Sequence, residues 1–328
     1  MNSLPISIII CAKNEANNIS EFLPYIINQE YENFEIILVN DHSTDATLEV
    51  MQSFKNEKIT LINLTNNSNK GNKKNALTQG INAAKNEHLL FTDADCKPVS
   101  NQWIKEMSTH FTTNKVLVLG YGAHQKIKNS WFNKLLRFET LLTAIQYFSY
   151  AKKGIPYMGV GRNIAFTKTA FQSVNGFKKH EHILSGDDDL FVNEIASYTN
   201  TAISIGENSF TSSKPHVSFK KWLHQKRRHI STANTYKPLH KFLLGLFYIS
   251  QFSFWILGIY LIIIGWQTQL VSILMLIRIG FQYLIFGASA NKLNEKDLIL
   301  YIPILELCLI SIQMRIFIAN LISKPKNW

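Results

Sequence analysis

Short runs of apolar residues alternate with polar, helix-forming stretches along the first two thirds of the chain. Continuous runs rich in isoleucine, leucine and valine are typical of strands buried on both faces of a sheet. They predict strands at residues 6–11, 34–39, 59–64, 88–92, 116–121 and 202–205. The stretches between them predict helices at about 17–28, 46–54, 75–84, 101–111 and 131–150, with Asp45 and Ser100 as N-caps. Because strands that alternate with helices pair in parallel, we expect an α/β fold with a mostly parallel sheet flanked by helices.

From residue 242 onward the pattern changes to long apolar segments. Residues 242–266, 270–290 and 298–322 are each long enough to cross a bilayer, which takes about 20 apolar residues in a helix. The link between the first two is short and uncharged, so they should form a hairpin. The sequence thus predicts a soluble domain at 1–235 and a membrane domain at 236–328 with about three transmembrane helices.

The formal net charge of +11 includes a cluster of basic residues at 214–229, directly ahead of the first apolar segment. Since basic flanks mark the cytoplasmic side, we expect a multi-pass protein of the inner (cytoplasmic) membrane, with the soluble domain and the loop at 291–297 in the cytoplasm. Three crossings would place Lys324 and Lys326 on the far side, which the charge rule disfavours. Because the same chain has membrane segments, its net positive charge favours a membrane surface or phosphorylated substrates over nucleic acid as the binding partner.

Arg278 and Glu306 lie inside the apolar segments, where a charge usually faces a partner. Counted from the loop that joins the two segments, Arg278 lies 290 − 278 = 12 residues deep and Glu306 lies 306 − 298 = 8 residues deep. At about 1.5 Å per residue, their heights differ by roughly 6 Å, which two long side chains can bridge. We therefore expect them to pair.

Cysteine usage and the N-terminus point to a reducing compartment. Cys11, Cys96 and Cys308 are an odd number and widely scattered, so neither a disulfide framework nor a zinc site is expected. The first apolar run lacks a basic flank and is too short for a signal peptide, so it is interpreted as a first buried strand.

Polar residues gather where three predicted strands end, at 14–15, 40–41 and 93–95. Ligands bind beyond the carboxyl ends of parallel strands, so these clusters are expected to converge. Asp93 and Asp95 would point the same way from an extended backbone and repel each other unless a cation lies between them. Mg²⁺ prefers such oxygen ligands and typically comes with phosphate. The alternative is an Asx-turn that closes the strand.

Three consecutive acids, Asp187, Asp188 and Asp189, open another predicted helix that ends near residue 198. They could simply complement the helix dipole, but adjacent carboxylates also raise one another's pKa, which suits a general base. Before them, Gly159 and Gly161 indicate a close backbone approach.

Two helical patterns remain. The aromatic-rich helix at 131–150 is either a packed core helix or a helix at the membrane interface. In the basic segment, Trp222, Gln225 and Arg228 recur every three residues and so share one helix face, which a basic flank alone does not explain.

Together these residues resemble the family 2 inverting glycosyltransferases, and more narrowly their membrane-anchored branch, which includes cellulose and hyaluronan synthases. The resemblance covers about residues 5–235, with the motifs in the family order. It implies the GT-A nucleotide-diphospho-sugar transferase fold followed by C-terminal transmembrane helices. It also implies transfer of a sugar from a nucleotide-diphospho-sugar, expected to be a UDP-sugar, to a lipid-linked or polymeric acceptor at the membrane.

The resemblance assigns nucleotide contacts to the ends of the early strands. Asn14 and Glu15 correspond to the pair that contacts the nucleotide, and Asp41 to the acid that reads the uracil edge. Asn40 and His42 depart from that motif. In residues 72–77, which resemble Gly-Lys-x-x-Ala-Leu with an asparagine in place of the glycine, Lys73 would approach the nucleotide.

The remaining motifs carry the implied chemistry. Asp93 and Asp95 match Asp-x-Asp, with Asp95 expected to bind Mg²⁺ or Mn²⁺ and Asp93 to hold the ribose or share the metal. Asp188 is the implied base, with Asp187 and Asp189 as rivals. Gln225 and Arg228 resemble Gln-x-x-Arg-Trp and would bind the donor, with Arg228 and Lys73 assisting the departing diphosphate. His229 stands where tryptophan is expected, which bears on processive synthesis.

Three other functions compete with this interpretation. A nucleotidyltransferase shares this kind of fold but needs a glycine-rich phosphate loop after the first strand, and residues 11–15 contain no glycine. A catalytically inactive, membrane-bound nucleotide-sugar-binding protein would not need the intact acidic motifs. A polyprenyl-phosphate sugar synthase stays open, because it too takes its acceptor from the membrane.

Overall fold

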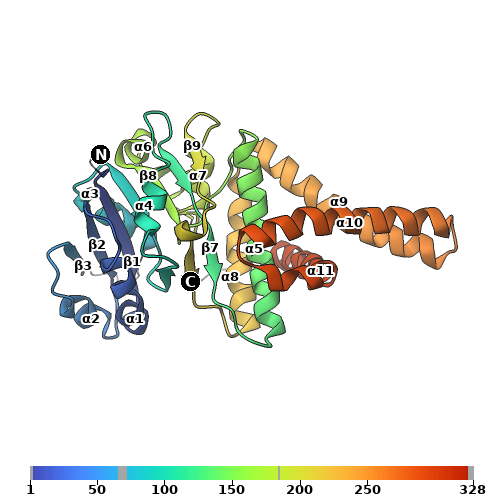
Figure 1. Ribbon diagram of the computed structural model, residues 1–328, viewed down its shortest axis with the longest axis horizontal. Helices are drawn as coiled ribbons and strands as arrows, with labels where there is room; N and C mark the ends of the chain where they lie inside the picture. Colours follow the sequence, from blue (N-terminus) through green and yellow to red (C-terminus); the bar gives the residue numbers. More distant parts are fainter. Residues whose placement is uncertain (1–2, 66–71, 184, 324–328) are drawn as a thin grey trace. The chain divides into compact units, whose positions relative to one another are not determined.

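A mixed sheet forms the centre of the first two thirds of the chain. The computed structural model describes residues 3–65, 72–183 and 185–323. Within these residues the main sheet has the strand order β3-β2-β1-β4-β8-β6-β9 (Figure 1). Its strands are β1 (Ile6–Ala12), β2 (Phe34–Asp41), β3 (Ile59–Leu64), β4 (His88–Phe91), β6 (Leu117–Leu119), β8 (Ile164–Thr167) and β9 (Thr201–Ile203). Only β8 runs antiparallel to its neighbours, β4 and β6, so the predicted mostly parallel sheet is confirmed.

A second, smaller sheet was not predicted. It has the order β5-β10-β7, with β5 (Cys96–Pro98), β7 (Gly122–His124) and β10 (Thr211–Ser213). Strands of three residues are too short to show a period of two in the sequence. The first of them begins directly after Asp95, where Cys96 pairs with Ser213, and so fixes the chain as it leaves the acidic pair.

Helices cover the main sheet and bury apolar stripes against it. They are α1 (Ala16–Ile27), α2 (Thr47–Ser53), α3 (Lys73–Ala83), α4 (Trp103–Ser108), α6 (Lys168–Ser173) and α7 (Asp189–Ile195), with the 3₁₀ turns η1 (Lys178–His180) and η2 (Glu207–Ser209). On α1, Ile19, Leu23 and Ile26 are buried at helical spacing. The N-caps of α2 and α4 are Ala46 and Gln102, so the predicted caps Asp45 and Ser100 are wrong by one and two residues. The Asp45 carboxylate still accepts the N–H of Thr47, the first residue of α2, at 3.0 Å.

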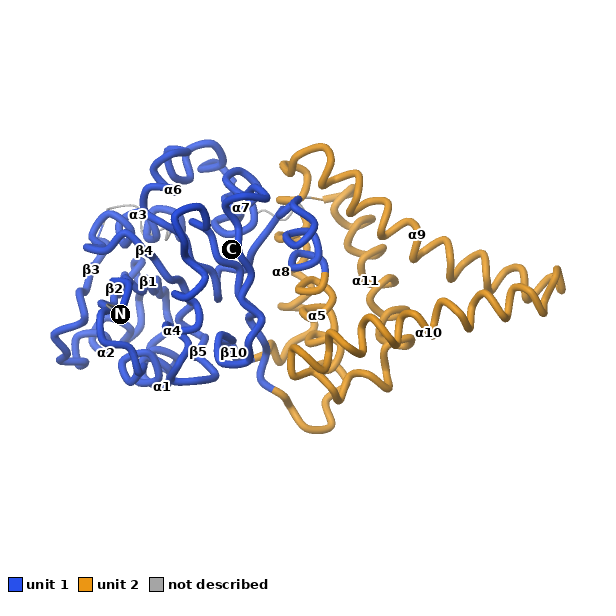
Figure 2. The backbone as a smooth tube through the Cα atoms, turned by 45° about the horizontal axis from the view of Figure 1, so that its top comes forward, with its two compact units in different colours: residues 1–125, 146–214 blue, residues 126–145, 215–328 orange. Residues whose placement is uncertain are grey.

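The described chain divides into two compact units, and the boundary differs from the expected one at residue 235. One unit holds residues 1–125 and 146–214, and the other holds 126–145 and 215–328 (Figure 2). Most of the aromatic helix α5 (Trp131–Lys152) and all of α8 (Phe219–Thr232) belong to the second unit. Packing explains this, because the Phe132 and Trp222 rings meet edge to face at 5.7 Å. Phe138 on α5 is fully buried, as a packed helix requires.

The second unit also contains the apolar segments. Its further elements are η3 (Ala233–Thr235), α9 (Pro238–Ile263), α10 (Thr268–Lys292), η4 (Lys296–Tyr301) and α11 (Ile302–Ile322). By length and composition, Pro238–Ile263, Thr268–Lys292 and Lys296–Ile322 could each cross a membrane. The helices α9 and α10 run side by side as the predicted hairpin (Figure 1). Lys324 and Lys326 lie outside the described residues.

The predicted pair inside the apolar segments is confirmed. The Arg278 guanidinium donates to both oxygens of Glu306, at 2.8 and 2.7 Å. The Glu306 carboxylate also accepts the Gln251 amide at 2.9 Å and the Trp255 indole N–H at 2.8 Å, so α9 joins the pair. Glu306 is 1% exposed, and four donors compensate its buried charge.

Candidate active site

Asp93 and Asp95 directly follow β4, at the carboxyl end of the central strands. Their carboxylate oxygens and the Cys96 sulfur lie within 4.8 Å of one another. Burial raises the pKa of Asp95, and the charge of Asp93 raises it further. Burial also raises the pKa of Cys96, whose protonated thiol donates to Asp95 at 3.3 Å. The two carboxylates are hard oxygen donors with excess negative charge, so they fit Mg²⁺ or Mn²⁺, whereas a protonated thiol does not.

Lys73 joins the two acidic motifs. It is the first residue of α3, and its Nζ lies 2.9 Å from Asp93 Oδ1 and 2.9 Å from Asp187 Oδ2. Burial alone would lower its pKa, but the charges of Asp187 and Asp93 outweigh burial and hold the pKa well above the ordinary value. A permanently charged ammonium therefore lies between residues that are 94 positions apart in the sequence (187 − 93 = 94).

Asp188 is held by backbone donors. The N–H of Gly161 donates to its Oδ2 at 2.7 Å, and the N–H of Asp189 donates to its Oδ1 at 2.8 Å. At Gly161 the predicted close backbone approach is therefore an approach to this carboxylate, whereas Gly159 lies against the side chains of Ile164 and Leu119. Asp188 is also the N-cap of α7, so the helix start fixes its position.

The first two acids of the triplet differ in protonation behaviour. Burial and the charges of Asp187 and Asp189 raise the pKa of Asp188 to about 7. Burial also raises the pKa of Asp187, but the ion pair with Lys73 outweighs burial and leaves that pKa below its ordinary value. Asp187 is thus a fixed anion near neutral pH, while Asp188 gains and loses a proton there.

A pocket brings these groups together. Asp93, Asp187, Asp188 and Lys73 line it with Gly161 and Cys11, and apolar side chains of β4, β8 and α3 complete its wall. Polar groups with shifted pKa values converge here on one concave surface, which is typical of an active site.

Asn14 and Glu15 lie at the end of β1, next to the Asp-x-Asp motif. Asn14 has a positive φ of 58°, and its side-chain oxygen accepts the N–H of Thr44 at 2.8 Å. Burial raises the pKa of Glu15, and the charges of Asp95 and Asp93 contribute to the rise. The predicted convergence of these two strand ends is therefore present.

Asp41 lies at the end of β2 and is 6% exposed. Its Oδ1 lies 2.9 Å from Nδ1 of His42 and accepts the N–H of Asn72 at 3.3 Å. His42 has a φ of 55°. The histidine that departs from the family motif at position 42 thus gives Asp41 a ring partner. The role of Asp41 in reading the base stays a prediction.

Lys74 is a site residue that the sequence did not reveal. It is 4% exposed, and its ammonium donates to the carbonyls of His180 at 2.6 Å and Ile183 at 2.9 Å. Both carbonyls belong to the loop ahead of the acid triplet. We therefore expect Lys74 to position that loop, while the adjacent Lys73 holds Asp187.

Replacing Lys74 with methionine is expected to lower the free energy of unfolding by about 1.5 to 3 kcal/mol, because two charge-assisted hydrogen bonds to buried carbonyls are lost. Transferase activity should fall further than nucleotide binding, since the acid triplet loses its support. The measurement is a thermal melt combined with turnover and titration of the nucleotide. Lys85→Met is the matched control, because that side chain is 81% exposed; equal effects in both variants would contradict a positioning role.

Gln225 and Arg228 lie on α8 in the second unit. The predicted helix is confirmed there, and Trp222 on the same helix is 1% exposed. Gln225 Oε1 lies 2.7 Å from Nε2 of His216. Donor binding by Gln225 and Arg228 stays a prediction.

Comparison with known sequences identifies relatives of the catalytic part. Residues 7–175, more than half of the chain, match the family model described as Glycosyl transferase family 2. An uncharacterized glycosyltransferase of Haemophilus influenzae is 27% identical over 198 residues, which cover 56% of this chain and 55% of that protein. A poly-beta-1,6-N-acetyl-D-glucosamine synthase of Staphylococcus epidermidis is 35% identical over 91 residues, which cover 27% of this chain and 21% of that protein. The chain thus spans about half or less of the length of these relatives.

Comparison with solved structures agrees on the fold. A mannosyltransferase from Pyrobaculum calidifontis, solved in complex with GDP-Man and Mn²⁺, superposes with a TM-score of 0.58 at 17% identity, covering 94% of this chain and 88% of that chain. The fold is the GT-A fold, as the resemblance implied. With its family match, its fold and its acidic motifs, the chain belongs to glycosyl transferase family 2.

Proposed function

We propose that this glycosyltransferase moves a sugar, with inversion, from a nucleotide-diphospho-sugar to a membrane-associated acceptor in polysaccharide or glycolipid assembly. The donor is expected to be a UDP-sugar. The observation that carries the proposal is the placement of Asp188, which faces the same pocket as Asp93 and Lys73 and has a pKa raised to about 7.

The reaction is a direct displacement at the anomeric carbon. The acceptor hydroxyl oxygen bonds to that carbon as the bond to the diphosphate oxygen breaks, and the hydroxyl proton goes to the Asp188 carboxylate. The two backbone N–H groups on Asp188 hold it in place, and the raised pKa makes it an effective proton acceptor near neutral pH. The nucleoside diphosphate leaves with the electron pair.

On the donor side, Asp95 and Asp93 are the residues that would hold a divalent cation, which would neutralise charge on the departing diphosphate. Asp95 is the stronger candidate, since Asp93 is already paired with Lys73 at 2.9 Å. Asn14, Glu15 and Asp41 support a nucleotide pocket at the ends of β1 and β2.

The long apolar helices support an acceptor at the membrane, and the Staphylococcus epidermidis relative, named as a poly-beta-1,6-N-acetyl-D-glucosamine synthase, makes a carbohydrate polymer a reasonable class. A polyprenyl phosphate is the other acceptor that this arrangement suits. Either acceptor could be reached from the inner membrane, where we place the protein with its catalytic unit in the cytoplasm.

The experiment is a screen of nucleotide sugars against the purified full chain, with release of nucleoside diphosphate as the readout. Release is expected with at least one UDP-sugar when Mg²⁺ or Mn²⁺ is present, and a chelator should abolish it. Asp95→Asn should lose the metal response. Metal-independent release, or no release from any nucleotide sugar with membrane extract as acceptor, would overturn the proposal.

A further inference from the structure

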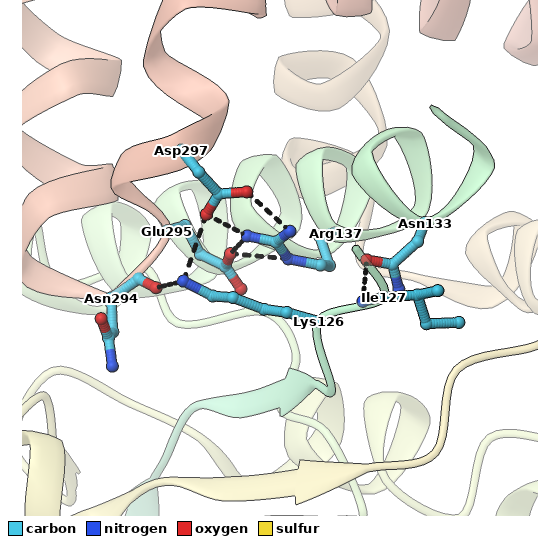
Figure 3. Close-up of polar contacts among 7 residues, drawn as sticks. All are labelled: Lys126, Ile127, Asn133, Arg137, Asn294, Glu295 and Asp297. Carbon is cyan, nitrogen blue, oxygen red and sulfur yellow. Dashed lines mark hydrogen bonds and ion pairs between the residues drawn. The ribbon is translucent and has the colours of Figure 1, made fainter. Parts of the chain in front are cut away.

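The start of α11 is held by helix α5. The Arg137 guanidinium donates to Glu295 at 2.8 Å and to Asp297 at 2.9 and 2.6 Å, in the turn between α10 and α11 (Figure 3). The Arg137 and Glu295 side chains are each 2% exposed. Lys126 adds an ion pair to Asp297 at 3.1 Å and donates to the Asn294 carbonyl at 2.6 Å. Two cations thus fix this turn.

The end of α11 is held by helix α8. The Arg227 guanidinium donates to the Asn320 side chain at 2.9 Å, to the Ala319 carbonyl at 3.0 Å and to the carbonyl of Ser323. The Asn320 amide donates back to the Arg227 carbonyl at 3.1 Å. An arginine that satisfies the last carbonyls of a helix is a C-terminal cap, so α11 ends at α8.

The helices α5 and α8 are themselves joined. Lys226 on α8 pairs with Glu139 on α5 at 2.7 Å. Lys226 is next to Arg227, and Glu139 comes two positions after Arg137. A chain of charged side chains therefore leads from the start of α11 to its end. In Figure 2 the backbone of α11 runs from the end of α10 back towards the beginning of α9.

This chain of charges is incompatible with a crossing by α11. The helix has 21 residues and is about 32 Å long, close to the roughly 30 Å of the hydrocarbon core. If α11 crossed, the charged side chains that link its two ends would lie in hydrocarbon. That placement is too costly, because α8 alone carries five Lys or Arg and no acid in 14 residues. Both α5 and α8 are also joined to the catalytic unit with no apolar span between, so they stay on its side of the membrane.

We propose that α11 does not cross the membrane but lies in the lipid leaflet on the side of the catalytic unit, leaving α9 and α10 as the two crossings. Its exposed side chains fit that leaflet. Ile304, Phe317, Leu321 and Ile322 are each more than half exposed, as apolar side chains in contact with lipid tails would be. Arg315, also exposed, can reach lipid headgroups, whereas in a crossing helix it would lie 322 − 315 = 7 residues, about 10 Å, from the nearer end.

This arrangement also removes a conflict within the sequence. With two crossings, the basic residues Lys324 and Lys326 belong to the same side as the basic segment before the first crossing, as the charge rule prefers. The proposal does not depend on the sugar transferred, so it stands or falls separately from the proposed function.

Topology in inverted membrane vesicles tests it. The full chain carries an epitope tag after Trp328, at the N-terminus, or in the α9–α10 link at Gln267. The C-terminal tag is expected to be cleaved by added protease together with the N-terminal tag, while the tag in the link stays protected. Cleavage of the C-terminal tag only from right-side-out vesicles, together with the link tag, would show that α11 crosses.

Depth measurements provide an independent test. A fluorophore is attached to single cysteines at positions 304, 311, 315, 318 and 322, in a Cys308→Ser background. The thiols of Cys11 and Cys96 have pKa values raised by burial and should react slowly. Quenching by nitroxide lipids is expected to place every position in the leaflet on the side of the catalytic unit, with depth varying mainly with the helical period. A steady descent to the bilayer centre and return to the opposite headgroups would overturn the proposal.

Discussion

Replacing Asp188 with asparagine is expected to lower the turnover of sugar transfer by about 10² to 10⁴-fold, the range that general-base catalysis typically contributes. The amide cannot accept the acceptor proton, yet it has nearly the same size. Nucleotide and metal binding should change little, because the contacts assigned to them lie on Asp93, Asp95 and Lys73. The measurement is turnover with the donor that the nucleotide-sugar screen identifies, alongside titration of the nucleoside diphosphate.

The pH dependence supplies a second readout of the same group. Only the carboxylate accepts a proton, and the folded pKa of Asp188 is raised from its ordinary value to about 7. Activity of the wild type should therefore rise as pH increases through 7 and fall about tenfold for each unit well below it. A flat profile between pH 5 and 8 would contradict the assignment.

The neighbouring acids serve as matched controls. Asp189 accepts the N–H of Leu190 at 2.8 Å and is 8% exposed, so Asp189→Asn tests burial and charge without removing the base. Asp187→Asn loses the ion pair with Lys73 and should weaken the donor side of the site as well. If Asp188→Asn keeps more than a tenth of the activity, Asp188 is not the base.

The strands and acidic motifs could be predicted because they depend on local pattern. β3 was predicted with its observed bounds, since a short run rich in isoleucine and leucine lies there between polar loops. Convergence of the polar clusters followed from parallel pairing, which places the ends of β1 and β4 on one edge. The reversed strand β8 and the strands of the smaller sheet, β5, β7 and β10, carry no such pattern and were missed.

The contacts that give the site its electrostatics could not be predicted. The two lysines at the start of α3 look equivalent in the sequence, but Lys73 pairs with Asp93 and Asp187 while Lys74 reaches carbonyls 106 and 109 positions away. Which lysine meets which partner depends on how α3 and the loop before α7 meet in three dimensions. The Arg278–Glu306 pair was different, because a charge inside an apolar segment needs a partner of opposite sign, and that requirement can be read from the sequence.

The last prediction concerns that pair. Arg278→Met is expected to lower the free energy of unfolding by about 3 to 5 kcal/mol, because Glu306 stays buried without its cation. The double variant Arg278→Met with Glu306→Gln should recover most of this loss, since no buried charge remains. The charge swap, Arg278→Glu with Glu306→Arg, should recover less, because the Trp255 and Gln251 donors that fit a carboxylate would then face a guanidinium. The measurement is the fraction of protein that stays monodisperse after heating in detergent.

Arg315→Met is the control for loss of a positive charge, since Arg315 lies on α11 but is exposed. Its effect should stay within about 0.5 kcal/mol of the wild type, as for surface substitutions in general. If Arg278→Met is no more harmful than this control, the pair does not stabilise the fold. If Arg278→Met lowers stability and the neutral double variant restores it, the four donors around Glu306 compensate one buried charge. Without that charge, their hydrogen bonds are no longer needed for stability.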